Sequence, residues 1–232
     1  ILKRNLTEPL GCGRIYKVVP KGKRLAKLKF SNNPKALVAM LGHKNGAIRD
    51  MAQQVLIDGK HTDAIPYLRK AITDKTHHLL VIHAMWVLEG LSALQSDEVL
   101  GLLKSDNYRI RVQALSVIPS VINANSSGAY IAALQQMLKG NDELIAPYIA
   151  FLAGNIKPYN EKLTNELLVA LVKRHPKNRY VSTAVISNLT HKEDAFAVSI
   201  ASVLPDTNLV INKQLQNIIT RLRNEKKSRG PE

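Results

Sequence analysis

The sequence predicts an all-α protein: an α-α superhelix of about five to six helical hairpins, preceded by a short N-terminal β-strand. The first observation is the spacing of apolar residues in the segment that starts near Gly46. Residues at i, i+3, i+4, i+7 and i+8 form one stripe of a 3.6-residue period, namely Ile48, Met51, Ala52, Val55 and Leu56. Such a stripe has to be buried against other helices.

The second observation is that this pattern recurs along the chain. When Ala52 is aligned with Ala84 and Ala114, the residues four positions before and three and four positions after each alanine are apolar. Extending the alignment to Ala146 and Ala184 gives spacings of 32, 30, 32 and 38 residues, with looser flanking matches. A period of this length, filled with helix pairs, is typical of an α-solenoid.

Length and composition agree with this class. Of the 232 residues 45% are hydrophobic and 5% aromatic, so the chain can bury a core but is poor in the residues of a large β-sheet. No apolar run approaches the roughly 20 residues that span a bilayer, so no transmembrane segment is predicted. The single cysteine, Cys12, excludes an internal disulfide framework and a metal cage built from cysteines.

Residues 1–30 differ from the rest of the chain. The run Arg14–Pro20 alternates, contains β-branched residues and is bounded by glycines and a proline, so we predict one strand there. A lone strand is not stable, and the chain opens with Ile1 and without the residue order of a signal peptide. We therefore expect this strand to complete a sheet in a preceding part of a longer protein, with 21–29 as a basic linker.

Residues 31–223 form the predicted superhelix, and 224–232 form a polar tail. Asn33 and Pro34 have the order of a helix cap and a first-turn proline. Thr62 or Asp63 is the expected cap of the third helix, and Thr76 that of the fourth. Acidic pairs at 97–98, 142–143 and 193–194 fall at expected helix starts, where negative charge is favourable. The expected helices are 34–41, 46–59, 62–72, 76 to at least 88, 97–103, 108–122, 128–138, 144–153, 161–172, 179–189, 193–204 and 209–223.

The aligned alanines have a packing role in this interpretation. Neighbouring helices approach to about 8–10 Å, where a large side chain would hold them apart. Arg49 and Arg111 each lie three residues before an aligned alanine and follow a turn that contains Asn45 or Asp106. This layout favours an arginine that bonds to the loop of a neighbouring repeat, and contact with a ligand is the alternative.

No residue of the chain is predicted to be catalytic, to bind a cofactor or to bind a metal. The closest histidines are His77, His78 and His83, and the last two are five residues apart, not the three or four that place two ligands on one helix face. His83 and Trp86 are instead expected at a contact between repeats, where the indole N–H finds a partner. The sequence contains no phosphate-binding loop, nucleophile elbow or HExxH motif.

Two resemblances add to this interpretation. Asp106, Arg111 and Ala114, with apolar residues between them, resemble the second helix of a HEAT repeat, although spacings of 30 to 38 residues are shorter than usual. The chain up to Leu94 is more narrowly similar to the helical part of the bacterial membrane-bound dehydrogenase family. This similarity is carried by Gly13-Arg14-Ile15-Tyr16, Asn33-Pro34, Leu41-Gly42-His43, Gly46, Arg49-Asp50 and His83 through Leu91.

In that family a glucose/sorbosone dehydrogenase-like β-propeller precedes the HEAT repeats, and a cytochrome c-like domain often follows. The resemblance implies that pyrroloquinoline quinone or haem would be bound by those neighbouring domains, with no cofactor in this chain. It also implies a periplasmic or secreted protein. The chain departs from the family at Ala47 and Ile48, where aromatic residues are usual, and it contains no Cys-x-x-Cys-His motif.

The charge distribution bears on three functional hypotheses. The net charge is +15, but residues 1–35 hold ten basic residues and one acidic residue, and 213–232 hold six and two. The rest of the chain is therefore nearly neutral. Nucleic-acid binding, as in HEAT-like DNA glycosylases, would need the positive charge on the helices, and an enzyme has the least support.

The hypothesis that the sequence favours is a non-catalytic HEAT-like module that docks an adjacent domain of the same polypeptide or another protein. The face formed by the second helix of each hairpin is the expected docking surface. Lys173 and Arg174 also suit the negative end of a helix dipole. The candidate docking residues are Arg49, Arg109, Arg111, Lys173 and Arg174.

Overall fold

The computed structural model describes residues 18, 21–22, 30–31, 33–140, 142–190, 192–206 and 209–229. The chain divides into two compact units, Ile1–Ser31 and Asn32–Glu232. The predicted strand at Arg14–Pro20 lies outside the described residues except for Val18, and so does most of the predicted linker. Every described helix belongs to the second unit.

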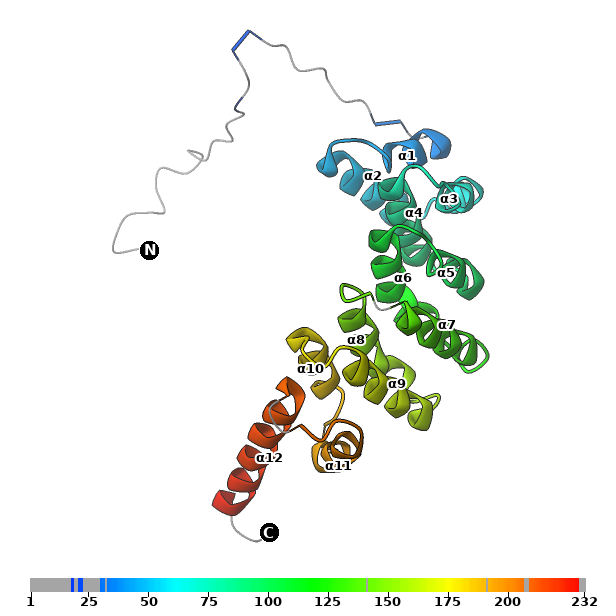
Figure 1. Cartoon of the computed structure of the whole chain (residues 1–232). Coiled ribbons are helices and arrows are strands. Elements are labelled where there is room, and N and C mark those ends of the chain that lie inside the picture. The colour runs from blue at the N-terminus through cyan, green and yellow to red at the C-terminus, as the bar shows by residue number, and fades with distance from the viewer. Residues whose placement is uncertain are drawn as a thin grey trace, which may run out of the picture. The chain divides into compact units, whose positions relative to one another are not determined.

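The described part of the second unit is helical and contains no strand, which confirms the predicted all-α class (Figure 1). A 3₁₀ turn, Thr62–Ala64, precedes the third helix. The odd-numbered helices are α1 (Pro34–Met40), α3 (Ile65–Ile72), α5 (Ser96–Leu102), α7 (Ser127–Lys139), α9 (Glu161–Arg174) and α11 (Glu193–Val203). The even-numbered helices are α2 (Gly46–Asp58), α4 (His78–Gly90), α6 (Tyr108–Val121), α8 (Ala146–Ile156), α10 (Arg179–Ile186) and α12 (Val210–Arg229).

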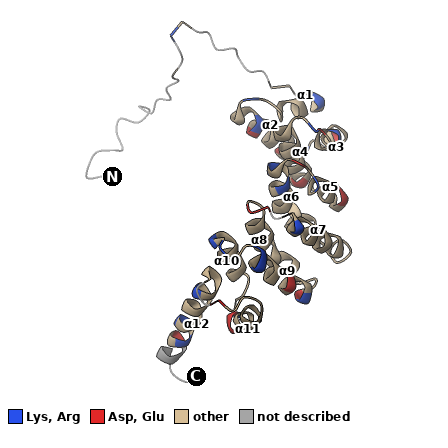
Figure 2. Ribbon diagram, viewed as in Figure 1, with Lys and Arg blue, Asp and Glu red and all other residues tan. Residues whose placement is uncertain are grey.

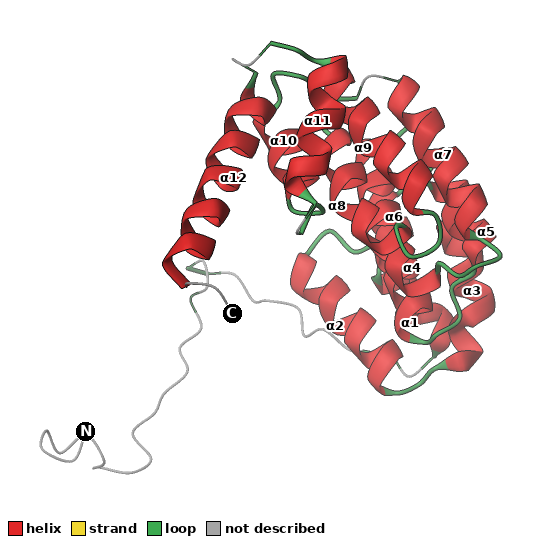
Figure 3. Cartoon of the chain, turned by 90° about the horizontal axis from the view of Figure 1, so that it is seen from below, coloured by secondary structure: helices red, strands yellow, loops and turns green. Residues whose placement is uncertain are grey.

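Contacts between the helices follow the chain order. Each odd-numbered helix contacts the even-numbered helix that follows it, from α1 with α2 to α11 with α12. The even-numbered helices also contact one another in sequence from α2 to α12, and α5, α7, α9 and α11 do the same. The second unit is therefore built in two layers of helices, which Figures 1 and 3 show from two directions.

Small buried residues lie where the even-numbered helices meet. Ala52, Ala84 and Ala114 each lie six residues after the first residue of their helix, and Ala184 lies five after. All four are fully buried, as the packing interpretation predicts. Leu88 and other branched residues of the same stripe complete a core that is almost entirely apolar.

The alignment is wrong at Ala146, which is the first residue of α8 and not a mid-helix position. The central alanine of α8 is Ala150, which is fully buried and whose carbonyl oxygen accepts a hydrogen bond from Asn188 Nδ2 at 2.8 Å. With Ala150 the flanking spacings become 36 and 34 residues. The apolar run 144–153 misled the alignment because nearly every position in it is apolar, so periodicity does not fix a register there.

Asparagine side chains begin many of the helices. The side-chain oxygens of Asn33, Asn45, Asn107, Asn160 and Asn178 each accept a hydrogen bond from a backbone N–H of the following first turn. This arrangement satisfies donors that have no partner inside the helix. Asn33 was predicted as a cap from the sequence, whereas Asn45 was assigned only to a turn.

Two predicted threonine caps are wrong. Neither Thr62 nor Asp63 forms a side-chain cap, because the 3₁₀ turn they begin supplies its own backbone bonds. Thr76 is not a cap either, because α4 starts two residues later. Asp74 organises that turn: its carboxylate accepts hydrogen bonds from the backbone N–H groups of Thr76 and His77, which holds the pKa of Asp74 well below its usual range.

Candidate docking surface

Arg49 and His83 join α2 to α4. Arg49 Nη1 donates to the carbonyl oxygen of His43 at 2.7 Å, and Arg49 Nε donates to His83 Nε2 at 3.1 Å. Because Nε2 accepts, the ring proton of a neutral His83 lies on Nδ1, which is 2.8 Å from Gln53 Oε1 and donates to it. Burial and the neighbouring Arg49 both lower the pKa of His83, so this neutral form is favoured.

Trp86 and Arg111 continue these links between even-numbered helices. Trp86 Nε1 donates to Gln113 Oε1 at 2.8 Å, so the indole has the partner that its position predicted. Arg111 Nη1 donates to the carbonyl oxygen of Ser105 at 2.8 Å, and Nη2 forms an ion pair with Asp142 Oδ2 at 2.7 Å. Asp142 lies in the loop before α8, so Arg111 bonds to the loop of the next repeat as predicted. The guanidinium groups of Arg49 and Arg111 are thus engaged within the protein.

Exposed aromatic residues lie on the next three even-numbered helices. Tyr148 and Phe151 are three residues apart on one face of α8 and are 43% and 56% exposed. Tyr108 is the first residue of α6 and Tyr180 the second of α10, and both are exposed. Because α8 contacts both α6 and α10, these side chains come from three adjacent helices.

None of these three helices carries a carboxylate, and α6 and α10 also carry arginines. The sequences of α6, α8 and α10 contain no Asp or Glu, whereas α5, α9 and α11 do, as Figure 2 shows. Arg109 lies beside Tyr108, with Nε 3.3 Å from the phenol oxygen. We define the aromatic face as the six exposed residues Tyr108, Arg109, Tyr148, Phe151, Arg179 and Tyr180.

The structure separates the predicted docking residues into two layers. Arg49, Arg109 and Arg111 lie on even-numbered helices, and of these Arg109 belongs to the aromatic face. Lys173 and Arg174 end α9 in the other layer, where Arg174 Nη2 donates to the carbonyl oxygen of Lys139 at 2.9 Å.

The sequence prediction missed Tyr148, Phe151 and Tyr180. Tyr148 and Phe151 fall outside the stripe formed by Ile149, Leu152 and Ile156, which are buried on α8, but the almost wholly apolar sequence of this helix does not distinguish the two sides. A large aromatic residue outside the buried stripe has no core to enter. Such a position indicates a surface that contacts something else.

Other kinds of site are not assembled in the described residues. No group of three or more His, Cys, Asp or Glu side chains there is placed to hold a metal ion. His77 lies beside Asp74, and His83 is engaged with Gln53 and Arg49. None of the described helices is long and apolar enough to cross a membrane.

Comparisons with protein-family models, with curated proteins and with solved structures return no match to this chain. The residue similarities described above therefore have no support beyond the sequence itself. The functional argument rests on the geometry of the surfaces.

Proposed function

We propose that residues 34–229 form a HEAT-like α-α superhelix that docks a partner protein or a neighbouring domain and catalyses no reaction itself. The observation that carries this proposal is the aromatic face, with exposed rings on three adjacent helices that contain no carboxylate. Exposed apolar patches mark interaction sites, and tyrosine and arginine contribute strongly to binding at protein interfaces.

The links between repeats support a positioning role. Arg49, His83, Trp86 and Arg111 fix successive even-numbered helices through directed bonds and not through apolar contact alone. A stack of this kind holds bound partners at a more constant spacing than a flexible linker does. The repeated contacts between α2, α4, α6, α8, α10 and α12 are those that a superhelix requires.

The chemistry of the aromatic face suggests the kind of partner. Arg109 and Arg179 lie on helices that contain no carboxylate, and Glu143 of the loop before α8 is the one acidic residue among the described residues that line the pocket beside Arg179 and Tyr180. The arginines favour a surface that combines apolar residues with Asp or Glu. The resemblance to the membrane-bound dehydrogenase family suggests an adjacent propeller or cytochrome c-like domain, with any quinone or haem held there, in a periplasmic or secreted protein. His83 and Trp86, two residues that carry this resemblance, connect the repeats in this chain.

Nucleic-acid binding is the second candidate, because arginines beside exposed tyrosines also suit phosphates and bases. Arg111 supports it less, since its charge is paired with Asp142. Binding through the basic ends of the chain alone would be weak and steeply salt-dependent. Anisotropy of labelled single-stranded and duplex 20-mers over a salt series tests this: binding that persists at 200 mM NaCl and is lost in Arg109→Ala/Arg179→Ala favours the second candidate.

Site-directed photocrosslinking in cells tests the docking proposal. The photoreactive residue p-benzoylphenylalanine replaces Phe151 in one variant and Tyr67 in the control, where Tyr67 is an exposed aromatic residue of α3 in the other layer. A protein captured only from position 151 is then purified and titrated. We expect its Kd to rise at least tenfold with Tyr148→Ala/Phe151→Ala and to stay unchanged with Tyr67→Ala. Equal capture from both positions, or unchanged affinity of the double variant, contradicts the proposal.

A further inference from the structure

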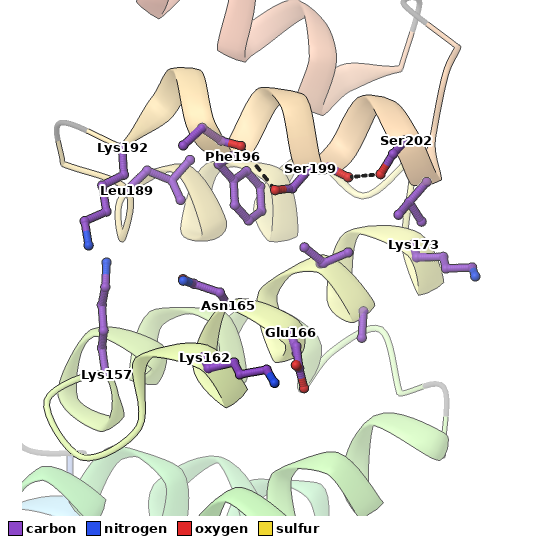
Figure 4. A pocket seen from close by; sticks show the side chains of 14 residues that line it. Lys157, Lys162, Asn165, Glu166, Lys173, Leu189, Lys192, Phe196, Ser199 and Ser202 are labelled. Carbon is purple, nitrogen blue, oxygen red and sulfur yellow. Dashed lines mark hydrogen bonds between the residues drawn. The ribbon is translucent and has the colours of Figure 1, made fainter.

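A groove separates α9 from α11 in the odd-numbered layer (Figure 4). Its volume is about 620 Å³, and it lies on the layer opposite to the aromatic face. Val169 and Ala170 of α9 and Val203 of α11 contribute partly exposed apolar side chains to it, whereas Phe196 and Leu189, which also line it, are almost fully buried. Such an exposed apolar groove between two helices offers the contact surface that a third helix needs.

The hydroxyl groups that line the groove are satisfied within α11. Ser199 Oγ donates to the carbonyl oxygen of Ala195 at 3.1 Å, and Ser202 Oγ donates to that of Ser199 at 2.8 Å. A ligand therefore does not have to supply acceptors for these donors. Ala195, Ser199 and Ser202 are also small, so this wall allows a close approach of backbone.

Four lysines line this apolar surface, together with one exposed carboxylate, Glu166, which lies four residues after Lys162 on α9. Figure 4 shows Lys157 and Lys192 pointing toward each other at one end of the groove and Lys173 at the other. Glu161 forms ion pairs with Lys157 and Lys192, and Lys192 lowers the pKa of Glu161. Lys162 and Lys173 are exposed and form no ion pair among the described residues.

We propose that this groove binds an acidic amphipathic helix of a partner protein. Apolar side chains at i, i+3, i+4 and i+7 of that helix contact the surface around Val169 and Phe196. Lys162 and Lys173 are eleven residues apart on α9, about 16 Å along the helix axis, so Asp or Glu about three turns apart on the partner meets both. Charge complementarity of this kind sets the orientation and specificity of docking.

The charge of the two ends of the sequence argues against either of them as the occupant. Residues 1–35 carry ten basic residues and one acidic residue, and 213–232 carry six and two. Either segment would bring like charge to the lysines. Nucleic acid fits less well, because the aromatic ring of the groove, Phe196, is 6% exposed and offers no face for a base to stack on.

This second docking surface goes beyond the proposed function and does not depend on the aromatic face. The probe is a fluorescein-labelled helical 16-mer with leucines at i, i+3, i+4 and i+7 and glutamates at both ends. Matched probes are a scrambled peptide of the same composition and a peptide with lysine for each glutamate. We expect the acidic amphipathic peptide to bind the full chain, and the scrambled peptide to bind at least tenfold more weakly.

Variants separate this groove from the aromatic face. Lys162→Glu/Lys173→Glu should weaken binding of the acidic peptide at least tenfold and strengthen binding of the lysine peptide. Loss of folding cannot produce such a reversal. Ser199→Leu should block the groove and weaken binding of the acidic peptide, whereas Phe151→Ala and Lys70→Glu should leave the affinity for that peptide unchanged. Equal binding of the scrambled peptide, an unchanged affinity in Lys162→Glu/Lys173→Glu, loss of binding in Phe151→Ala, or full competition by a single-stranded 20-mer would each overturn the proposal.

Discussion

The even-numbered helices before Asp142 are joined differently from those after it. From α2 to α6, and on to the loop before α8, side chains bond to side chains: Arg49 and Gln53 with His83, Trp86 with Gln113, and Arg111 with Asp142.

Between α8 and α10 the link runs from a side chain to backbone carbonyls, and the side-chain bond of Gln214 Nε2 to Thr183 Oγ1, at 3.3 Å, joins α12 to α10. Asn188 Nδ2 donates to the carbonyl oxygens of Ala150 and Ala184 at 2.8 and 2.7 Å. Gly154 makes room for it, because a Cβ there would lie 2.8 Å from Asn188 Oδ1. The lysine-rimmed groove and four of the six residues of the aromatic face belong to this second region, whereas Tyr108 and Arg109 of that face lie on α6. The first region thus uses more of its polar side chains to join repeats, and the second leaves more apolar surface available for partners.

Two substitutions that create a cavity in the core, one in each region, test this comparison, and their expected effect is the largest. Leu88→Ala in the first region and Leu168→Ala in the second each remove a fully buried side chain. Each should lower the free energy of unfolding by about 2–5 kcal/mol. Urea unfolding followed by circular dichroism measures both.

The two variants should differ in cooperativity. If the second region is less tightly joined, Leu168→Ala should split the transition or lower its m value, and Leu88→Ala should not. Val198→Ala, at a 73% exposed position of α11, is the control and should stay within about 0.5 kcal/mol of wild type. Identical single transitions for both leucine variants would remove the distinction between the regions.

The link at the boundary between the regions should give the next largest effect. Arg111→Met removes three hydrogen bonds, two to backbone carbonyls and one to Asp142. We expect it to cost about 2–3 kcal/mol, because hydrogen bonds to charged groups are the stronger kind. A double-mutant cycle with Asp142→Asn isolates the ion pair, for which we expect a coupling of about 1 kcal/mol. Arg109→Met, on the surface, should leave stability nearly unchanged, and an equal loss there would mean that Arg111 has no special role.

The sequence predicted that Arg111 bonds to the loop of a neighbouring repeat, because Arg111 follows a turn at a suitable spacing. It did not predict Asp142 as the partner, because the acidic pair 142–143 was expected at a helix start, whereas α8 begins at Ala146 with no acidic residue in its first turn. The order of the helices and the buried positions of Ala52, Ala84 and Ala114 were predictable, since a 3.6-residue period and a recurring small residue are properties of the sequence itself. Some bounds were wrong: α12 continues to Arg229, through most of the predicted polar tail.

The features that the sequence did not reveal are surfaces that no other described helix covers. The register of α8 was misplaced because an almost wholly apolar segment has no periodic contrast, and Tyr148 and Phe151 were hidden in the same segment. The groove between α9 and α11 depends on how far apart two helices lie. That separation is a tertiary quantity, and no local pattern around Val169 or Phe196 encodes it.

Two histidines, half-buried His83 and buried His175, provide a smaller test of the same comparison. His83 has both ring nitrogens bonded, whereas the buried Nδ1 of His175, after α9, has no hydrogen-bond partner. His83→Leu should cost about 1–2 kcal/mol, because Arg49 and Gln53 lose their partner. His175→Leu should be close to neutral at pH 7.5, since it removes an unsatisfied polar group. A larger loss for His175→Leu than for His83→Leu would contradict this assignment.

Both histidines should also make stability depend on pH in the same direction. Burial lowers the pKa of each in the folded state, while the unfolded chain titrates near about 6.5. Below that pH the unfolded state binds protons first, so the free energy of unfolding falls as pH falls toward the folded pKa. Urea unfolding at pH 7.5 and 5.5 should show this loss, and His83→Leu and His175→Leu should each reduce it. A pH effect that is unchanged in the double variant would assign it to other groups.

Helix caps should give the smallest effect. Asn45 accepts one backbone N–H of α2 at 3.1 Å, whereas Asn178 accepts two from α10, at 3.0 Å from Tyr180 and 3.3 Å from Val181. Alanine at either position should cost about 1 kcal/mol, with the larger loss at Asn178. Because α10 is short and Tyr180 belongs to the aromatic face, Asn178→Ala should also speed amide exchange at the start of α10 and weaken docking. Asn178→Ser keeps an acceptor and should restore both, so a docking defect that persists in Asn178→Ser would show that the asparagine contacts the partner directly.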